Sequence, residues 1–167
     1  ILADLMTYQE QRGAIKGKKI AWIGDGCNVC QTYMQAVNIF DFSLSIATPE
    51  GYEPSQSYVD KYQNNIEYFN KPLDACKDAD IIVTDVWTSM GQESEQKERE
   101  LAFKGFQVDE EMMSKAKSDV IFMHCLPAYR GKEVSADVID GKQSVIWDEA
   151  ENRLHAQKAL LLYLIED

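Results

Sequence analysis

Short apolar runs that end at small or acidic residues recur along this chain and alternate with stretches of helical periodicity. Runs of this length and β-branched content are typical of buried strands. They lie at residues 20–23, 42–47, 66–69, 81–84, 120–123 and 144–147. Helices are expected at residues 1–12, 29–37, 56–64, 72–75, 109–116 and 149–165. The alternation predicts βαβ units, and hence an α/β fold with a doubly wound, Rossmann-like parallel sheet that carries helices on both faces.

The first expected helix has a clear apolar pattern. Leu2, Leu5 and Met6 follow the spacing of one helical face, and Gly13 suits a C-terminal cap. Residues 86–105, in contrast, form a long polar stretch, which we interpret as a loop. A loop of that length in a compact domain is usually functional or mobile, so we expect chemistry there.

Length, charge and cysteine content limit the class of protein. The 167 residues suffice for one domain with a hydrophobic core. The formal net charge of -11 argues against nucleic-acid and anionic-membrane partners, which require clustered Lys and Arg. The four cysteines are too scattered for a disulfide scaffold, which favours thiols in a reducing cytoplasm. The chain opens without Met inside an amphipathic pattern, and we interpret it as a piece of a longer protein.

The Gly-Asp-Gly turn at residues 24–26 follows the first strand, as in dinucleotide-binding sites. Val29 stands where such a motif requires Gly or Ala, so a turn set by strand-to-helix geometry is the favoured interpretation. Asn28 begins the next helix, where it could cap the helix or donate to a substrate carboxylate. Cys27 and Cys30 have the spacing of a redox or zinc pair, but no second pair or nearby His completes a metal set.

Two further segments follow buried strands at the expected carboxyl edge of the sheet. Asp85 precedes a Trp-Thr-Ser-Met-Gly stretch at residues 87–91, which combines a carboxylate, hydroxyls and a Gly hinge and suits an amino-bearing ligand. His124 and Cys125 follow the strand at 120–123, but neighbours in an extended chain point to opposite faces, so a Cys/His dyad is not expected. Arg153 on the last helix is available to a phosphate or carboxylate, or to a surface ion pair.

Four segments together resemble the ornithine carbamoyltransferases. They read Trp-Ile-Gly-Asp-Gly-Cys-Asn at 22–28, Asp-Val-Trp-Thr-Ser-Met-Gly-Gln-Glu at 85–93, Phe-Met-His-Cys-Leu-Pro at 122–127 and Glu-Ala-Glu-Asn-Arg at 149–153. The resemblance extends over nearly the whole chain. The Ser-Met-Gly and His-Cys-Leu-Pro segments distinguish this family from the aspartate carbamoyltransferases, whose second domain recognises a dicarboxylic amino acid.

The resemblance implies that residues 1–167 are the ornithine-binding domain of an enzyme that carbamoylates the δ-amino group of L-ornithine. The donor is carbamoyl phosphate, the products are L-citrulline and phosphate, and neither a cofactor nor a metal is implied. The residues implied to hold ornithine are Asn28, Asp85, Ser89 and Met90, with Asp85 and Cys125 orienting the δ-amino group. Those implied to contact carbamoyl phosphate are Cys125, Leu126 and Arg153.

The sequence also departs from the family pattern. The family usually has Asn at the position of Cys27 and His-Ser where residues 31–32 are Gln-Thr, which concerns packing of the helix start more than binding by Asn28. The family's first domain, with its Ser-Thr-Arg-Thr and His-Pro-x-Gln segments, is absent from this chain. We therefore expect that the chain folds, has no turnover alone and binds ornithine weakly. The resemblance implies a homotrimer for the intact enzyme, chiefly through first-domain contacts.

Two alternatives from other classes stay open at this point. A nicotinamide-dependent oxidoreductase domain would use the Gly-Asp-Gly turn for its cofactor. A non-catalytic amino-acid-binding module would bind ornithine without any transfer.

Overall fold

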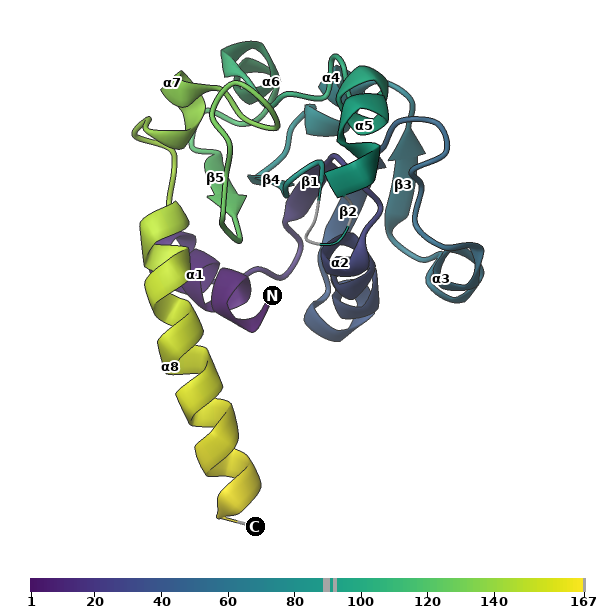
Figure 1. Cartoon of the computed structure of the whole chain (residues 1–167). Coiled ribbons are helices and arrows are strands. Elements are labelled where there is room, and N and C mark those ends of the chain that lie inside the picture. Colours follow the sequence, from purple (N-terminus) through teal and green to yellow (C-terminus); the bar gives the residue numbers. More distant parts are fainter. Residues whose placement is uncertain (89–90, 92, 167) are drawn as a thin grey trace.

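The centre of the molecule is a five-stranded parallel sheet with the strand order β3-β2-β1-β4-β5 (Figure 1). The computed structural model describes residues 1–88, 91 and 93–166. The strands are β1 (Lys19–Ile23), β2 (Ser43–Ala47), β3 (Ile66–Phe69), β4 (Ile81–Thr84) and β5 (Ile121–His124). Every neighbouring pair is parallel, which confirms the predicted α/β class.

Helices connect the strands and cover both faces of the sheet. They are α1 (Leu2–Arg12), α2 (Asn28–Phe40), α3 (Gln56–Lys61), α4 (Pro72–Cys76), α5 (Gln96–Ala102), α6 (Glu110–Lys115), α7 (Ala136–Ile139) and α8 (Ile146–Ile165), with a short 3₁₀ helix η1 (Glu93–Glu95). Alternate side chains of β1 enter different cores: Ile20 and Trp22 pack with α1, α2 and α3, whereas Ala21 and Ile23 pack with α4, α6 and α7. The prediction of a sheet covered on both faces is therefore confirmed.

The order of the strands creates a switch point at the centre of the sheet. After β1 the chain moves outward to β2 and β3, and it then returns to the other side of β1 to form β4 and β5. At such a point the two connections leave the sheet in opposite directions, which opens a crevice beyond the carboxyl ends of the strands. The loops after β1, β4 and β5 meet at this edge.

Two of the sequence predictions were wrong about secondary structure. The run at residues 144–147 is not a strand: Ser144 forms a single bridge with Phe122, and α8 begins at Ile146. Acidic residues in the first turn of α8 favour a helix start there over a strand. The stretch at 86–105 is not one loop, because η1 and α5 lie within it.

The buried face of α1 also differs from the predicted stripe. Its buried residues are Ala3, Asp4, Thr7 and Tyr8, whereas the side chain of Leu2 is 49% exposed. The reason is that α1 lies against α8, where the amide of Asn152 donates to the hydroxyl of Thr7 at 3.0 Å. Gly13 ends α1 as predicted, with a φ of 84°.

Within the ranges that the structure describes, no helix is both long enough and apolar enough to cross a membrane.

Candidate active site

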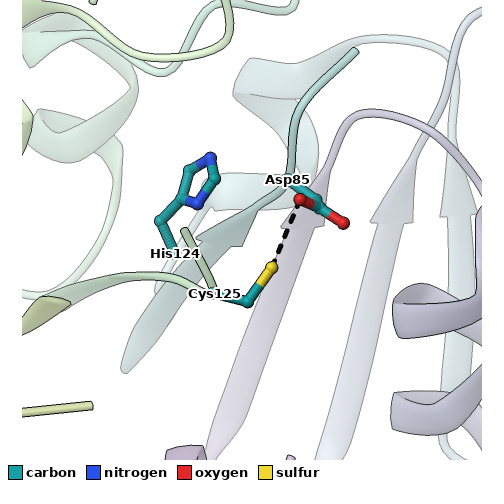
Figure 2. A group of neighbouring side chains, drawn as sticks. All are labelled: Asp85, His124 and Cys125. Carbon is teal, nitrogen blue, oxygen red and sulfur yellow. Dashed lines mark hydrogen bonds between the residues drawn. The ribbon is translucent and has the colours of Figure 1, made fainter. Parts of the chain in front are cut away.

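The carboxylate of Asp85 is the centre of the site at the switch point. It follows β4 and is 8% exposed. Its Oδ1 accepts hydrogen bonds from the Val86 backbone N–H at 2.7 Å and from the Cys125 thiol at 3.2 Å (Figure 2). Its Oδ2 accepts a longer contact from the thiol of Cys27 at 3.8 Å. Three donors from the ends of β1, β4 and β5 therefore fix one buried carboxylate.

Both thiols beside this carboxylate are held in the protonated form. Burial, and after it the charge of Asp85, raises the pKa of Cys125 well above the ordinary thiol value. Burial is also the main cause that raises the pKa of Cys27, to which the neighbouring Asp85 adds. Because the thiolate is the nucleophilic form, Cys125 at neutral pH is a hydrogen-bond donor rather than a covalent nucleophile.

The imidazole of His124 is not paired with the adjacent thiol. Figure 2 shows the Cys125 thiol bonded to Asp85 and not to the imidazole, whose Nδ1 accepts the backbone N–H of Leu126 at 2.9 Å. Its Nε2 lies 3.4 Å from Oε1 of Glu133. The Cys125 thiol donates to Asp85 and Nδ1 of His124 accepts a backbone N–H, so each group is engaged elsewhere, and the absence of a catalytic dyad stays a prediction.

Asp85, His124 and Cys125 also make up a set of possible metal ligands, since one ligand atom of each lies within 4.8 Å of the others. Each of these groups already has a partner in the protein. Nδ1 of His124 accepts a backbone N–H, and Oδ1 of Asp85 accepts both a backbone N–H and the thiol. A cation would have to displace these bonds, so the set is not an open, preformed ligand cluster.

A cavity of about 330 Å³ lies beside Cys125, between the start of α1, the first turn of α2 and α8. Arg153 lines it from α8, so two of the residues implied to contact carbamoyl phosphate share one cavity. Leu126 does not line this cavity; it has a φ of 54°, in the left-handed region. The full lining is Ile1, Leu2, Ala3, Asp4, Val29, Cys125, Glu149, Arg153, Ala156, Gln157 and Leu160.

Two buried carboxyl groups in the wall of this cavity were not among the predicted site residues. Asp4 on α1 is 8% exposed, and Glu149 on α8 is 2% exposed. The hydroxyl of Tyr33 donates to Asp4 at 2.5 Å, and Oε2 of Glu149 accepts the backbone N–H of His124 at 2.9 Å. Burial, and after it the nearby Asp4, raises the pKa of Glu149 to about 8. The only sequence signal was that Asp4 and Glu149 begin helices, which more often indicates favourable dipole contacts at exposed sites.

The Gly-Asp-Gly turn packs against protein rather than an open phosphate site. The N–H of Gly26 donates to the carbonyl of Tyr52 at 2.8 Å. A Cβ on Gly26 would lie 2.2 Å from the backbone nitrogen of Pro54. The close approach of the loop at residues 52–54 therefore requires glycine at position 26. Packing explains this glycine without a bound nucleotide, which weakens the nicotinamide alternative.

A buried arginine links two of the loops around the site, and sequence reasoning missed it. Arg99 on α5 donates to the carbonyl of Trp87 and to the carboxylate of Asp25. Its guanidinium lies 4.7 Å from the centre of the Tyr52 ring. With its charge paired and its plane stacked, Arg99 joins the loop after β1 to the loop after β4.

The remaining predicted residues have mixed placements. Asn28 is exposed in the first turn of α2, while Cys27 occupies the capping position, so Asn28 is not the cap. Ser89 and Met90, the other residues implied to hold ornithine, lie outside the described residues. Cys27 and Cys30 are not bonded to each other: all four cysteines are free, and Cys30 is fully buried.

The chain is similar over nearly its whole length to proteins of known sequence. The ornithine carbamoyltransferase of Ruthia magnifica subsp. Calyptogena magnifica is 59% identical over 165 residues, which are 99% of this chain and 55% of that protein. The ornithine carbamoyltransferase of Acinetobacter baylyi is 56% identical over 167 residues, which are 100% of this chain and 55% of that protein. The chain thus spans little more than half the length of these curated relatives.

Solved structures give the same result. The structure of the Burkholderia thailandensis ornithine carbamoyltransferase superposes with a TM-score of 0.88 at 52% identity, covering 97% of this chain and 52% of that one. The Pyrococcus furiosus enzyme gives a TM-score of 0.89 at 50% identity, covering 95% of this chain and 53% of that one. The family model described as aspartate/ornithine carbamoyltransferase, Asp/Orn binding domain, matches residues 16–164. This chain therefore belongs to the aspartate/ornithine carbamoyltransferase family, in which it matches the Asp/Orn binding domain.

Proposed function

We propose that this chain is the ornithine-binding half of an ornithine carbamoyltransferase, whose other half binds carbamoyl phosphate. In the proposed reaction the δ-amino nitrogen of L-ornithine attacks the carbonyl carbon of carbamoyl phosphate. The bond from that carbon to the phosphate oxygen breaks, the amine loses a proton, and L-citrulline and phosphate leave. The relatives that carry this name are the ornithine carbamoyltransferases described above.

The observation that carries the proposal is the fixed carboxylate of Asp85 at the switch point. A buried anion attracts an ammonium group. Its orientation by the Val86 N–H and the Cys125 thiol leaves Oδ2, among the described residues, with the long contact to Cys27. An incoming amine can take the place of that weak contact. Once the amine is deprotonated, the same carboxylate holds the lone pair of the amine nitrogen in one direction. This is the positional advantage that proximity catalysis requires.

The cavity beside Cys125 supports a place for the second substrate. Arg153 is exposed on α8 and reaches this cavity, where a guanidinium suits phosphate as a planar, permanently charged donor. Cationic groups near the leaving oxygen stabilise the negative charge that develops as phosphate departs. We assign Cys125, Leu126 and Arg153 to carbamoyl phosphate, and Asn28, Asp85, Ser89 and Met90 to ornithine, as parts of this proposal.

The second half of α8 supports the idea that a further domain completes the enzyme. Its first half packs on α1, but the rest extends away from the body of the molecule (Figure 1). Leu161, Leu164 and Ile165 on this part are 59%, 63% and 76% exposed. A contiguous apolar surface of this kind marks an interaction site. Since the relatives are nearly twice as long as the match, we propose that their carbamoyl-phosphate-binding domain covers it.

The same proposal includes the assembly and the compartment. The intact enzyme is a homotrimer formed chiefly through the first domain, and it acts in the cytoplasm. The four unpaired thiols suit a reducing compartment, and the net charge of -11 disfavours a nucleic-acid partner.

A chimeric enzyme tests the reaction. The part of the Acinetobacter baylyi enzyme that this chain does not match is placed ahead of residues 1–167, and citrulline formation is measured with ornithine, aspartate and acetylornithine as acceptors. We expect turnover with ornithine alone. The chain without that domain should form no citrulline and should bind ornithine weakly in calorimetry.

Two results would contradict the proposal. One is a folded chimera that carbamoylates none of the three acceptors, or prefers aspartate. The other is steady citrulline formation by the 167-residue chain alone. A chimera that binds ornithine but transfers nothing would instead support the non-catalytic binding module.

A further inference from the structure

The turn that follows β5 contains a residue in an unfavourable backbone conformation. Leu126 has a φ of 54°, a conformation in which the Cβ of an L-residue crowds the following carbonyl oxygen. Such residues persist only where the surroundings hold them in place, and they are frequent at binding sites. Leu126 directly follows Cys125, so whatever holds it also sets the shape of the site at this edge.

The side chain that holds Leu126 is the imidazole of His124. Its Nδ1 accepts the Leu126 N–H at 2.9 Å, and its side chain is fully buried. A ring nitrogen that accepts a backbone N–H carries no proton, so in the neutral ring the proton is on Nε2. The Leu126 conformation therefore depends on one tautomer of His124.

The carboxylate of Glu133 is placed to select that tautomer. Its Oε1 lies 3.4 Å from Nε2 of His124, an electrostatic contact that is not aligned as a hydrogen bond, and Glu133 is 1% exposed. The same oxygen accepts the backbone N–H of Tyr129, and the backbone carbonyl of Glu133 accepts the N–H of Val108 at 2.9 Å. Glu133 is thus fixed through both its main chain and its side chain. Its carboxylate faces the imidazole nitrogen that must carry the proton.

We propose that Glu133 is a positioning residue, which acts through His124 to hold the Cys125–Leu126 turn in the shape that receives carbamoyl phosphate. This inference rests on the proposed function for the identity of the ligand. Glu133 is not among the residues that line the cavity beside Cys125, and in the described part of the chain its side chain reaches the turn through His124 and the Tyr129 N–H. Asp85 is held by the Val86 N–H as well as by the Cys125 thiol, so the ornithine side of the site should depend on Glu133 less than the carbamoyl phosphate side does.

Nitrogen NMR of the imidazoles tests the tautomer without any activity. The sequence has two histidines, and His155 lies on α8 with a half-exposed side chain, so it is an internal reference. We expect His124 in the ¹⁵N-histidine-labelled chain to carry its proton on Nε2 near neutral pH. Glu133→Gln keeps an oxygen acceptor and should preserve this state, whereas Glu133→Ala should give a mixture of tautomers.

Kinetics of the chimera test the consequence for the substrate. Glu133→Ala should raise KM for carbamoyl phosphate by about tenfold or more, the effect of losing the buried carboxylate that faces Nε2 of His124, while KM for ornithine changes by a smaller factor. Glu133→Gln should restore most of the loss. The matched control is Asp140→Asn, which breaks the exposed pair between Arg130 and Asp140 in the same segment and should change neither KM.

The outcomes separate this inference from the proposed function. A proton on Nδ1 of His124 overturns the inference whatever the activity. So does a Glu133→Ala chimera that is less heat-stable but has an unchanged KM for carbamoyl phosphate, because that result assigns Glu133 a structural role only. An inactive chimera without substitutions contradicts the proposed function, and the imidazole spectra then decide the inference by themselves.

Discussion

The thiol of Cys125 donates to Oδ1 of Asp85 at 3.2 Å, across the ends of the adjacent strands β4 and β5. The carboxylate is buried, and burial together with the charge of Asp85 raises the pKa of the thiol further above neutral pH. The pair is suited to holding a ligand in one orientation rather than to covalent attack. The chemistry of the site therefore depends on where its groups lie.

Replacing Asp85 by Asn tests the role of the charge. The amide keeps the shape of the carboxylate but attracts an ammonium group much less, so Kd for ornithine in the chimera should rise more than tenfold, about 2 kcal/mol. Calorimetry measures this change, with Asp74→Asn, an exposed position on α4, as the matched control. An unchanged Kd in a folded Asp85→Asn variant would remove Asp85 from the ornithine site.

Alkylation of Cys125 tests the protonated thiol. Because its pKa is raised, iodoacetamide near pH 8 should react with Cys125 more slowly than with free cysteine. Asp85→Asn removes the negative charge, which lowers the thiol pKa and should accelerate labelling. Peptide-resolved mass spectrometry measures both rates. Cys76, whose pKa burial raises to about 12, is an internal control that Asp85→Asn should leave unchanged.

Much of this site could be anticipated from the strand pattern. The run Ile81–Thr84 is β-branched and fully buried, so both β4 and its end at Asp85 were predictable. The ends of parallel strands meet at one edge, which led to the expectation that Asp85 and Cys125 are close. The strand-like run at 144–147 failed because a short apolar segment has no periodicity that separates a strand from a helix start.

The acidic wall of the cavity could not be anticipated in the same way. Asp4 and Glu149 are far apart in the sequence, and their burial depends on how α1 packs against α8. The apolar spacing of Leu2, Leu5 and Met6 indicated a different buried face for α1. Apolar periodicity predicts which face of a helix packs on a hydrophobic core. A polar contact, such as that between Thr7 and Asn152, can bury a different face.

The raised pKa of Glu149 predicts a specific loss of stability with pH. A carboxyl whose pKa is about 8 in the folded state and about 4.3 when unfolded binds more protons in the folded state between these values, so the free energy of unfolding falls as pH rises. We expect a loss of about 2 kcal/mol between pH 6 and 8. Glu149→Gln, which mimics the protonated group, should reduce this slope.

Urea denaturation of the chain at pH 6, 7 and 8 measures the effect. The matched control is Glu166→Gln at the exposed end of the same helix, which should leave the slope unchanged. Equal slopes for the original chain and Glu149→Gln would mean that Glu149 is ionised throughout this range.

Arg99 should be important for stability although it lies outside the proposed chemistry. Arg99→Lys keeps the charge but cannot donate to the Trp87 carbonyl and the Asp25 carboxylate in the same fork, so it should lower the free energy of unfolding by about 2 kcal/mol. Lys97→Ala, an exposed change on the same helix, should have almost no effect. A variant with Lys at position 99 that is as stable as the original would show that the linkage between the two loops is not required for folding.

The exposed end of α8 tests the proposed contact with a carbamoyl-phosphate-binding domain. Because Leu161 and Leu164 are mostly exposed, replacing both by Ser should change the stability of the isolated chain by no more than about 0.5 kcal/mol. If the first domain covers these side chains in the chimera, each lost contact should remove roughly 1–3 kcal/mol there. Thermal denaturation of both proteins compares the two cases, with Lys158→Ser as an exposed polar control on the same helix. Equal effects in the chain and the chimera would mean that another surface receives the first domain, because burial against it is the only proposed source of the difference.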